Sequence, residues 1–286
     1  MRRARGIWRA LWRNKVGMAS LIFLCLVLAA GLFAPLLSAH DPLAVDMKNR
    51  LGPCTAEHLL GTDSLGRDIL ARLLYGARTS MGLALCVMLA TVGIGSLLGL
   101  AAGTFRGLFD SLVMRVTEVL MSFPSEVLVL ALVGMAGPGM ENAFLACVLC
   151  RWPWYARVAR SLTLGFRDMN YVAYARVAGF SRTHILVRHI LPCASGEIAV
   201  LATLDCAPVL LMISALSFLG LGVQPPVPEW GTMLGEAREV MILHPWQMLP
   251  PGLAILLVVA AFNFLGDALR DALDPWRTLP QPGERP

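Results

Sequence analysis

Long apolar runs alternate with short polar segments along most of the chain. The first run, residues 16–38, is long enough to cross a bilayer, because a transmembrane helix needs about 20 residues. The apolar core of a cleaved signal peptide is only about 7–15 residues long, so an uncleaved anchor is favoured. Five further spans are expected at Ser80–Phe105, Leu112–Ala136, Glu141–Ala159, Ile198–Leu219 and Met248–Leu265. The pattern therefore predicts an all-α integral membrane protein with six transmembrane helices.

The polar segments give the expected organisation around these spans. They are a basic N-terminus at residues 1–15, a loop of balanced charge at residues 39–78 with a helix near Arg67–Tyr75, a basic loop at residues 160–197 within a five-helix core at residues 79–273, and a tail at residues 274–286. Basic residues concentrate in cytoplasmic loops. With six spans, all the basic segments fall on one side. We therefore expect both termini and the basic loop in the cytoplasm and residues 39–78 outside.

An arginine-rich stretch, Asn170–Pro192, carries the clearest local pattern in the basic loop. Its apolar positions at i, i+3, i+4 and i+7 share one helical face, and they are Tyr171, Tyr174, Ala175 and Ala178. Gly179 is suited to the left-handed conformation that ends a helix, and Ser181 is suited to cap the next one. The stretch predicts a helix, a turn and a second helix. On spacing alone, a docking element and a basic loop that only fixes orientation are equally open interpretations.

Composition agrees with a membrane protein. Of the 286 residues, 57% are hydrophobic and 15% are charged, whereas soluble domains are about 25% charged. The net charge of +5 does not indicate nucleic-acid binding, because the arginines flank the apolar runs. The seven cysteines lie mostly inside those runs and do not resemble a disulfide framework.

Motifs for catalysis, metal binding and nucleotide binding are not found in the sequence. The five histidines are scattered, and only His184 and His189 are near one another, so no metal site is expected. A phosphate-binding P-loop needs a Gly-Lys pair, but the two lysines follow Asn14 and Met47. This polypeptide is therefore expected to hold no cofactor and to be no enzyme.

Three charged residues inside the predicted spans are candidates for a membrane pathway: Glu126, Arg151 and Asp205. Each charge at a helix centre costs about 2.5–3.5 kcal/mol, so such residues usually face the bundle interior or water. Glu126 and Arg151 are similarly distant from the turn between the third and fourth spans. We hypothesise that they pair at one depth; the alternative is that each side chain snorkels to the membrane surface or pairs elsewhere.

Five stretches resemble the permease subunits of dipeptide, oligopeptide and nickel-class ABC importers, and among these the nickel-type second permease subunit. They are LGTDSLGRDILARLLYGARTSMGLAL (residues 60–85), WPWYARVARS (152–161), the arginine-rich stretch with Gly179 and Ile190-Leu191-Pro192, ALSFLGLGVQPPVPEWGTML (215–234) and FNFLGDALRDALDP (262–275). The family signature begins Glu-Ala-Ala where this chain has Ala173-Tyr174-Ala175, and it has isoleucine at the position of His189. Any contact that needs the missing carboxylate is therefore in doubt.

The resemblance implies a type I ABC importer permease fold in the bacterial inner membrane. It implies a second, similar permease subunit, two cytoplasmic ATPase subunits that bind ATP and Mg²⁺, and an external substrate-binding protein. The residues expected to contact an ATPase are Tyr171, Tyr174, Ala175, Arg176, Gly179, Phe180 and Arg182. The expected cargo is nickel or a metal–chelator complex, with a dipeptide or oligopeptide as the nearest alternative. A secondary transporter driven by an ion gradient is the alternative from another class.

Overall fold

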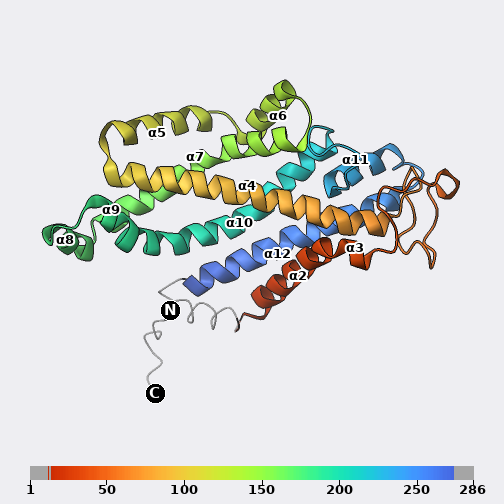
Figure 1. The fold of residues 1–286 in the computed structure, drawn as a ribbon, viewed down its shortest axis with the longest axis horizontal. Coiled ribbons are helices and arrows are strands. Elements are labelled where there is room, and N and C mark those ends of the chain that lie inside the picture. The colour runs from red at the N-terminus through yellow and green to blue at the C-terminus, as the bar shows by residue number, and fades with distance from the viewer. Residues whose placement is uncertain (1–11, 13, 274–286) are drawn as a thin grey trace, which may run out of the picture.

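Helices form most of the described structure, which is a computed structural model covering residue 12 and residues 14–273. Five long helices lie side by side (Figure 1): α2 (Lys15–Leu32), α4 (Ile69–Phe105), α7 (Met140–Arg167), α10 (Leu191–Phe218) and α12 (Leu249–Leu273). Most of the expected basic N-terminal segment, residues 1–11 and 13, and the whole tail at residues 274–286 lie outside the described residues.

Shorter helices lie between the long ones. They are α3 (Ala34–Leu37), η1 (Met47–Asn49), α5 (Gly107–Met121), α6 (Ser125–Ala136), α8 (Asn170–Val177), α9 (Arg182–Ile185), η2 (Leu186–Ile190), α11 (Trp230–Glu239) and η3 (Pro245–Met248). Helices α8 and α9 lie at one end of the bundle, and α11 lies at the other (Figure 1). We call these the α8–α9 end and the α11 end.

The expectation of six spans is met only in part. Among residues 14–273, four helices are long and apolar enough to cross a membrane, or five if α5 and α6 are counted as one broken span. These two helices meet at an angle of 85°, because Pro124 lacks a backbone N–H and disfavours a helical residue before it. The predicted fourth span lies within α7, which carries Glu141, Arg151 and further arginines along its length.

The second span is longer than its apolar run. Asp68 caps α4 by accepting the N–H of Ala71 at 2.6 Å, so the helix begins at Ile69 and continues for 37 residues. The helix expected near Arg67–Tyr75 is therefore the first part of α4, and the polar loop ends at residue 68 rather than at 78. At 1.5 Å per residue α4 is about 55 Å long, so it extends well beyond a hydrocarbon core of about 30 Å.

The closest contact in the bundle joins α4 to α7, which run in the same direction. Three glycines four residues apart on α4 face α7: Gly95, Gly99 and Gly103. A Cβ added to Gly99 would lie 2.1 Å from the carbonyl oxygen of Ala156, and one added to Gly95 would lie 2.5 Å from that of Trp152. Small residues at such positions let helix backbones touch in a membrane.

A buried charged network ties the start of α4 to α11. Arg67 donates to Asp63 at 2.7 Å and to Glu236 at 2.9 Å, and the fully buried Arg72 bonds to the same two carboxylates. Glu229, also fully buried, caps α11 and accepts the Ser80 hydroxyl at 2.8 Å. The charged residues Asp63, Arg67, Arg72, Glu229 and Glu236 thus have a structural role at the α11 end.

The α4–α7 contact predicts that glycine-to-alanine substitutions at two positions of α4 change the stability of the protein differently. Gly99→Ala should destabilise the protein by about 1–3 kcal/mol, because the new methyl group forces the backbones of α4 and α7 apart. Gly93→Ala is the matched control: its Cβ meets no atom within 4 Å, so the free energy of unfolding should stay equal or rise by up to about 1 kcal/mol. Denaturation in detergent micelles measures both, and equal effects would contradict the close contact.

Candidate functional site

The arginine-rich loop, residues 168–190, connects α7 to α10 at the α8–α9 end. The predicted turn is confirmed: Gly179 has a φ of 82°, and the N–H of Phe180 reaches back to the carbonyl of Ala175 at 3.1 Å. The predicted cap is also confirmed, because the Ser181 hydroxyl accepts the N–H of His184 at 3.2 Å. The second helix differs from the prediction: α9 passes through the π-helical η2 directly into α10.

The inner face of the loop is packed against the ends of three long helices. Val172, Ala175, Ile185 and Ile190 are buried in one cluster with residues of α4, α7 and α10, which are Leu100, Ala159, Ala194 and Ile198. Ala175 is only 6% exposed, so it does not share an outer face with Tyr171 and Tyr174 as expected. It is a packing residue of the loop, and its side chain is not available to a partner.

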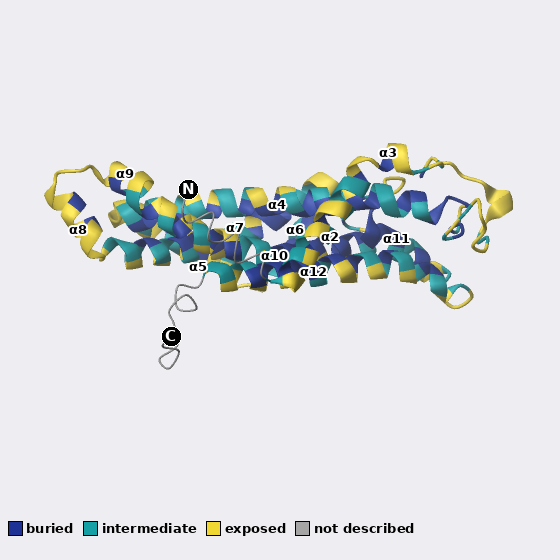
Figure 2. Ribbon diagram, turned by 90° about the horizontal axis from the view of Figure 1, so that it is seen from below, coloured by how far each residue is buried: buried dark blue, intermediate teal, exposed yellow. Residues whose placement is uncertain are grey.

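The outer face of α8 is aromatic and apolar. Tyr174 is 75% exposed and Val177 is 88% exposed, and Tyr171 and Phe180 are exposed beside them. Figure 2 shows this end of the bundle largely in the colour of exposed residues. Val177 was not among the expected contacts, although its spacing of three residues from Tyr174 places it on a neighbouring part of the same helix surface.

Both arginines that were expected to contact an ATPase bind helix ends in the structure. Arg176 donates to the carbonyl oxygen of Arg167 at 2.8 Å, and Arg182 donates to that of Phe105 at 3.4 Å. These carbonyls lie in the last turns of α7 and α4, where backbone acceptors lack helical partners and the helix dipole is negative. The loop is therefore attached to both helices by charge-assisted hydrogen bonds as well as by apolar packing.

A basic cavity of about 330 Å³ lies beneath this attachment. Arg106, Arg167, Arg176 and Arg182 line it together with Phe180. Burial, followed by the positive charges of Arg106 and Arg176, lowers the pKa of the Arg167 guanidinium. One of its nitrogens, Nη1, is buried without a hydrogen-bond partner among the described residues. The cavity thus has a strongly positive potential suited to an anionic group.

A second cavity, of about 320 Å³, lies at the middle of α7 and α10. It is lined by Arg151 and Asp205 with apolar and aromatic neighbours, which are Leu120, Met121, Phe123, Cys150 and Trp154, and with Ser125. Arg151 forms an ion pair with Asp205, and the Tyr155 hydroxyl donates to the other oxygen of Asp205 at 3.1 Å. Tyr155 was not predicted, because nothing in its sequence context distinguishes it from a core aromatic residue.

The hypothesised pair of Glu126 and Arg151 is wrong. Glu126 lies in the first turn of α6, is exposed, and accepts the Ser125 hydroxyl at 3.0 Å. The hypothesis measured depth along a straight third span, whereas α5 and α6 meet at 85° at the break just before Glu126. Arg151 instead pairs across the bundle with Asp205, so two of the three pathway candidates are brought together.

No metal site was expected, because the histidines are scattered along the sequence, yet two of them lie near a carboxylate in the structure. His40, His58 and Asp68 place one potential ligand atom each within 4.8 Å of one another at the α11 end. These residues are far apart in sequence, so only the folding of the loop between α3 and α4 brings them together.

Comparisons with known proteins decide the family. Residues 95–279 match the family described as "Binding-protein-dependent transport system inner membrane component". The chain belongs to this family. Residues 3–53 also match the "N-terminal TM domain of oligopeptide transport permease C". The chain is thus a permease with several apolar helices from an inner-membrane transport family.

Curated relatives match over nearly the whole permease. The metal-staphylopine import system permease protein CntC of Staphylococcus aureus is 42% identical over 94% of this chain and 93% of that protein. The nickel transport system permease protein NikC of Escherichia coli is 40% identical, covering 90% and 92%. The dipeptide transport system permease protein DppC of Alkalihalophilus pseudofirmus is 38% identical, covering 95% and 89%.

A solved structure shares the fold. A chain of the MetNI methionine ABC transporter in inward-facing conformations superimposes with a TM-score of 0.58, covering 72% of this permease and 98% of that chain. At 15% sequence identity the likeness concerns the fold alone. It agrees with the expected type I importer permease fold.

The partner of Arg151 is testable by double-mutant cycles. Because Arg151 and Asp205 are in contact and mostly shielded from water, Arg151→Met and Asp205→Asn should show a coupling energy of about 1 kcal/mol or more. Arg151→Met combined with Glu126→Gln should be additive within about 0.5 kcal/mol, because these residues do not interact. The free energy of unfolding in micelles is the measurement, and stronger coupling to Glu126 would reverse the assignment.

Proposed function

We propose that this permease forms half of the translocation pathway of an ATP-driven importer and that the outer face of α8 docks on a cytoplasmic ATPase subunit. The observation that carries the proposal is the contrast between the two faces of the arginine-rich loop. Its inner face is fixed to α4, α7 and α10, while its outer face presents Tyr171, Tyr174, Val177 and Phe180. Exposed aromatic clusters of this kind are typical of protein interfaces.

The attachments explain how docking would drive transport. A displacement of the arginine-rich loop is carried through Arg176 of α8 to the end of α7 and through Arg182 of α9 to the end of α4. These two helices are in backbone contact, so they move as one body. Nucleotide binding by the ATPases would then bias the equilibrium between inward-facing and outward-facing arrangements of the pathway.

The path of the chain supports a topology with both termini in the cytoplasm. Helix α2 begins and α12 ends toward the α8–α9 end (Figure 1). Six passes result if α5 and α6 together cross once and α7 crosses once. On this basis we assign the α8–α9 end to the cytoplasm and the loop of residues 39–68 to the external side.

The remaining partners follow from the family. We propose a second, similar permease subunit, two ATPase subunits that bind ATP and Mg²⁺, and an external substrate-binding protein. The basic cavity with Arg167 would receive a carboxylate from the ATPase. The sequence of the permease itself has no Gly-Lys pair for nucleotide binding, so hydrolysis falls to the partners.

For the cargo we propose a metal–chelator complex, as the names of CntC and NikC support, with a dipeptide as the alternative that the name of DppC supports. The second cavity is lined by one positive side chain, Arg151, and one negative side chain, Asp205, which neutralise each other. Trp154 and Phe123 line it beside them. Such a lining offers little net attraction to a bare divalent ion. It suits an organic ligand that carries both charges and an apolar part.

Uptake into proteoliposomes tests the proposed function. The complete importer, reconstituted with its binding protein outside and ATP inside, should accumulate a nickel–chelator complex in preference to a dipeptide. Uptake should stop when ATP is replaced by a non-hydrolysable analogue. Uptake that persists on an ion gradient without ATP would establish a secondary transporter instead, and preference for the dipeptide would correct the cargo alone.

The arginine-rich loop gives a sharper test. Gly179→Val places a β-branched residue at a φ of 82°, which costs about 1–2 kcal/mol or more. The equilibrium constant for the docking conformation of the loop should therefore fall by roughly 5–30-fold, and ATP-dependent uptake should fall as this conformation is depleted. Membrane insertion and the assembly of the bundle should be unchanged.

Gly165→Val is the matched control for this substitution. Gly165 lies in α7 near the same end, its backbone is helical, and its Cβ would meet no atom within 4 Å. This variant should transport at the unmodified rate. Coupled transport at that rate by the Gly179 variant as well would refute the docking role of the loop.

A further inference from the structure

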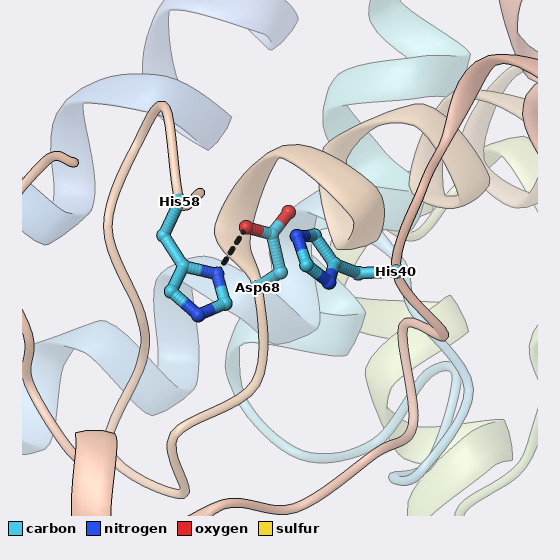
Figure 3. Close-up of side chains that lie close together, drawn as sticks. All are labelled: His40, His58 and Asp68. Atoms are coloured by element: carbon cyan, nitrogen blue, oxygen red, sulfur yellow. Dashed lines mark hydrogen bonds and ion pairs between the residues drawn. The ribbon is translucent and has the colours of Figure 1, made fainter. Parts of the chain in front are cut away.

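Three metal-ligating side chains meet at the α11 end, away from the arginine-rich loop (Figure 3). His40 comes from the segment after α3, His58 from the segment before α4, and Asp68 from the N-cap of α4. Nδ1 of His58 lies 2.9 Å from Oδ2 of Asp68, and the centroids of the His40 and His58 imidazole rings are 4.8 Å apart. Both histidines are half-buried and Asp68 is buried.

Backbone contacts hold the segment that carries His58 against the segment that leads into Asp68. The carbonyl oxygen of Asp46 lies so close to Gly66 that an added Cβ would be 1.7 Å away, and Gly52 donates to the Thr62 hydroxyl at 2.8 Å. Asp68 is also fixed, because its Oδ1 accepts the N–H of Ala71 at 2.6 Å. The carboxylate is thus oriented in advance, with Oδ2 turned toward His58.

A purely structural role accounts for only part of this arrangement. A hydrogen bond from His58 to Asp68 would orient the helix cap, but it does not require a second imidazole. His40 is tied to the carbonyl oxygen of Glu57 through Nε2 at 2.9 Å. Ligand histidines in metal sites commonly make such a bond with one ring nitrogen, and it limits the orientations of the ring.

We propose that His40, His58 and Asp68 bind a divalent transition-metal ion such as Zn²⁺ or Ni²⁺. Two neutral imidazoles and one carboxylate are ligands that these borderline ions prefer, whereas Mg²⁺ and Ca²⁺ prefer oxygen alone. Ligands about 2.0–2.1 Å from one tetrahedral ion are about 3.4 Å apart. With a present spread of up to 4.8 Å, the three ligand atoms would move closer together by up to about 1.4 Å when the ion binds.

The ion would join the loop of residues 39–68 to the first turn of α4. Three protein ligands leave at least one coordination position for water or an exogenous group. A bound ion would therefore stabilise the α11 end, at which the cargo is proposed to enter. The site does not depend on the cargo, so it would exist in a peptide importer as well as in a metal importer.

The test is metal binding by the purified full-length permease, carrying no histidine tag and studied without its partners. Titration with Zn²⁺ or Ni²⁺ against a chromophoric chelator should show one site per chain. His40→Gln, His58→Gln and Asp68→Asn should each weaken binding at least about tenfold. Asparagine still caps helices, so Asp68→Asn removes the charge while retaining the cap.

The control is the variant with both His184→Gln and His189→Gln. These histidines lie at the α8–α9 end with ring centroids 6.0 Å apart, so they reveal adventitious binding by paired imidazoles. This variant should bind the ion as tightly as the unmodified chain. The proposal fails if it loses the site, if the three site variants bind normally, or if the unmodified chain binds no ion at 100-fold excess over the protein.

Chemical modification tests the same site without any substitution. In the unmodified chain, Zn²⁺ should protect His40 and His58 from diethyl pyrocarbonate and leave the reaction of His184 unchanged. Equal reaction rates of His40 and His58 with and without the ion would overturn the assignment. Because neither experiment involves transport, their outcome is separate from that of the proposed importer function.

Discussion

The structure depends on the direct contact between the backbones of α4 and α7. Gly95, Gly99 and Gly103 permit that contact, because any side chain at Gly99 would collide with the carbonyl oxygen of Ala156. Lipid tails are as apolar as leucine, so close packing rather than the hydrophobic effect holds such a helix pair together. Each end of the pair then carries one attachment: the charged network with α11 at one end and the arginine-rich loop at the other.

Buried charges fix the geometry of the bundle more than they stabilise it. Arg72 with Asp63 and Glu236, and Arg151 with Asp205, are removed from most solvent, and the desolvation of such groups offsets much of their attraction. A misplaced helix would leave one of these charges without its partner, at a large energetic cost. Each pair therefore favours one alignment of the helices that it joins. Arg72 aligns α4 with α11, and Arg151 aligns α7 with α10.

Local signals in the sequence predicted local structure well. The turn at Gly179 and the cap at Ser181 follow from backbone sterics and one hydrogen bond, and both appear as expected. Long-range contacts were not accessible in this way. Glu126 was misplaced because a break at Pro124 redirects α6, and the partner of Arg151 came from a helix that no spacing rule connects to α7.

The inner face of the arginine-rich loop shows why a helical pattern alone is ambiguous. Tyr171, Tyr174 and Ala175 satisfy one amphipathic spacing, yet the buried stripe is formed by Val172 and Ala175. Two overlapping stripes on a short helix differ by one residue step, about 100°. Which stripe is buried depends on the apolar residues of α4, α7 and α10 that contact the loop. The sequence of α8 alone does not contain that information.

The arrangement of arginines would let the loop stay anchored while it receives the proposed partner. Arg176 and Arg182 are engaged with the carbonyls of Arg167 and Phe105, whereas Nη1 of Arg167 has no partner among the described residues. A carboxylate entering the basic cavity would therefore bind Arg167 without breaking either anchoring bond. It would also reduce the repulsion among four neighbouring positive charges, so docking would tighten the attachment of the loop to α4 and α7 instead of competing with it.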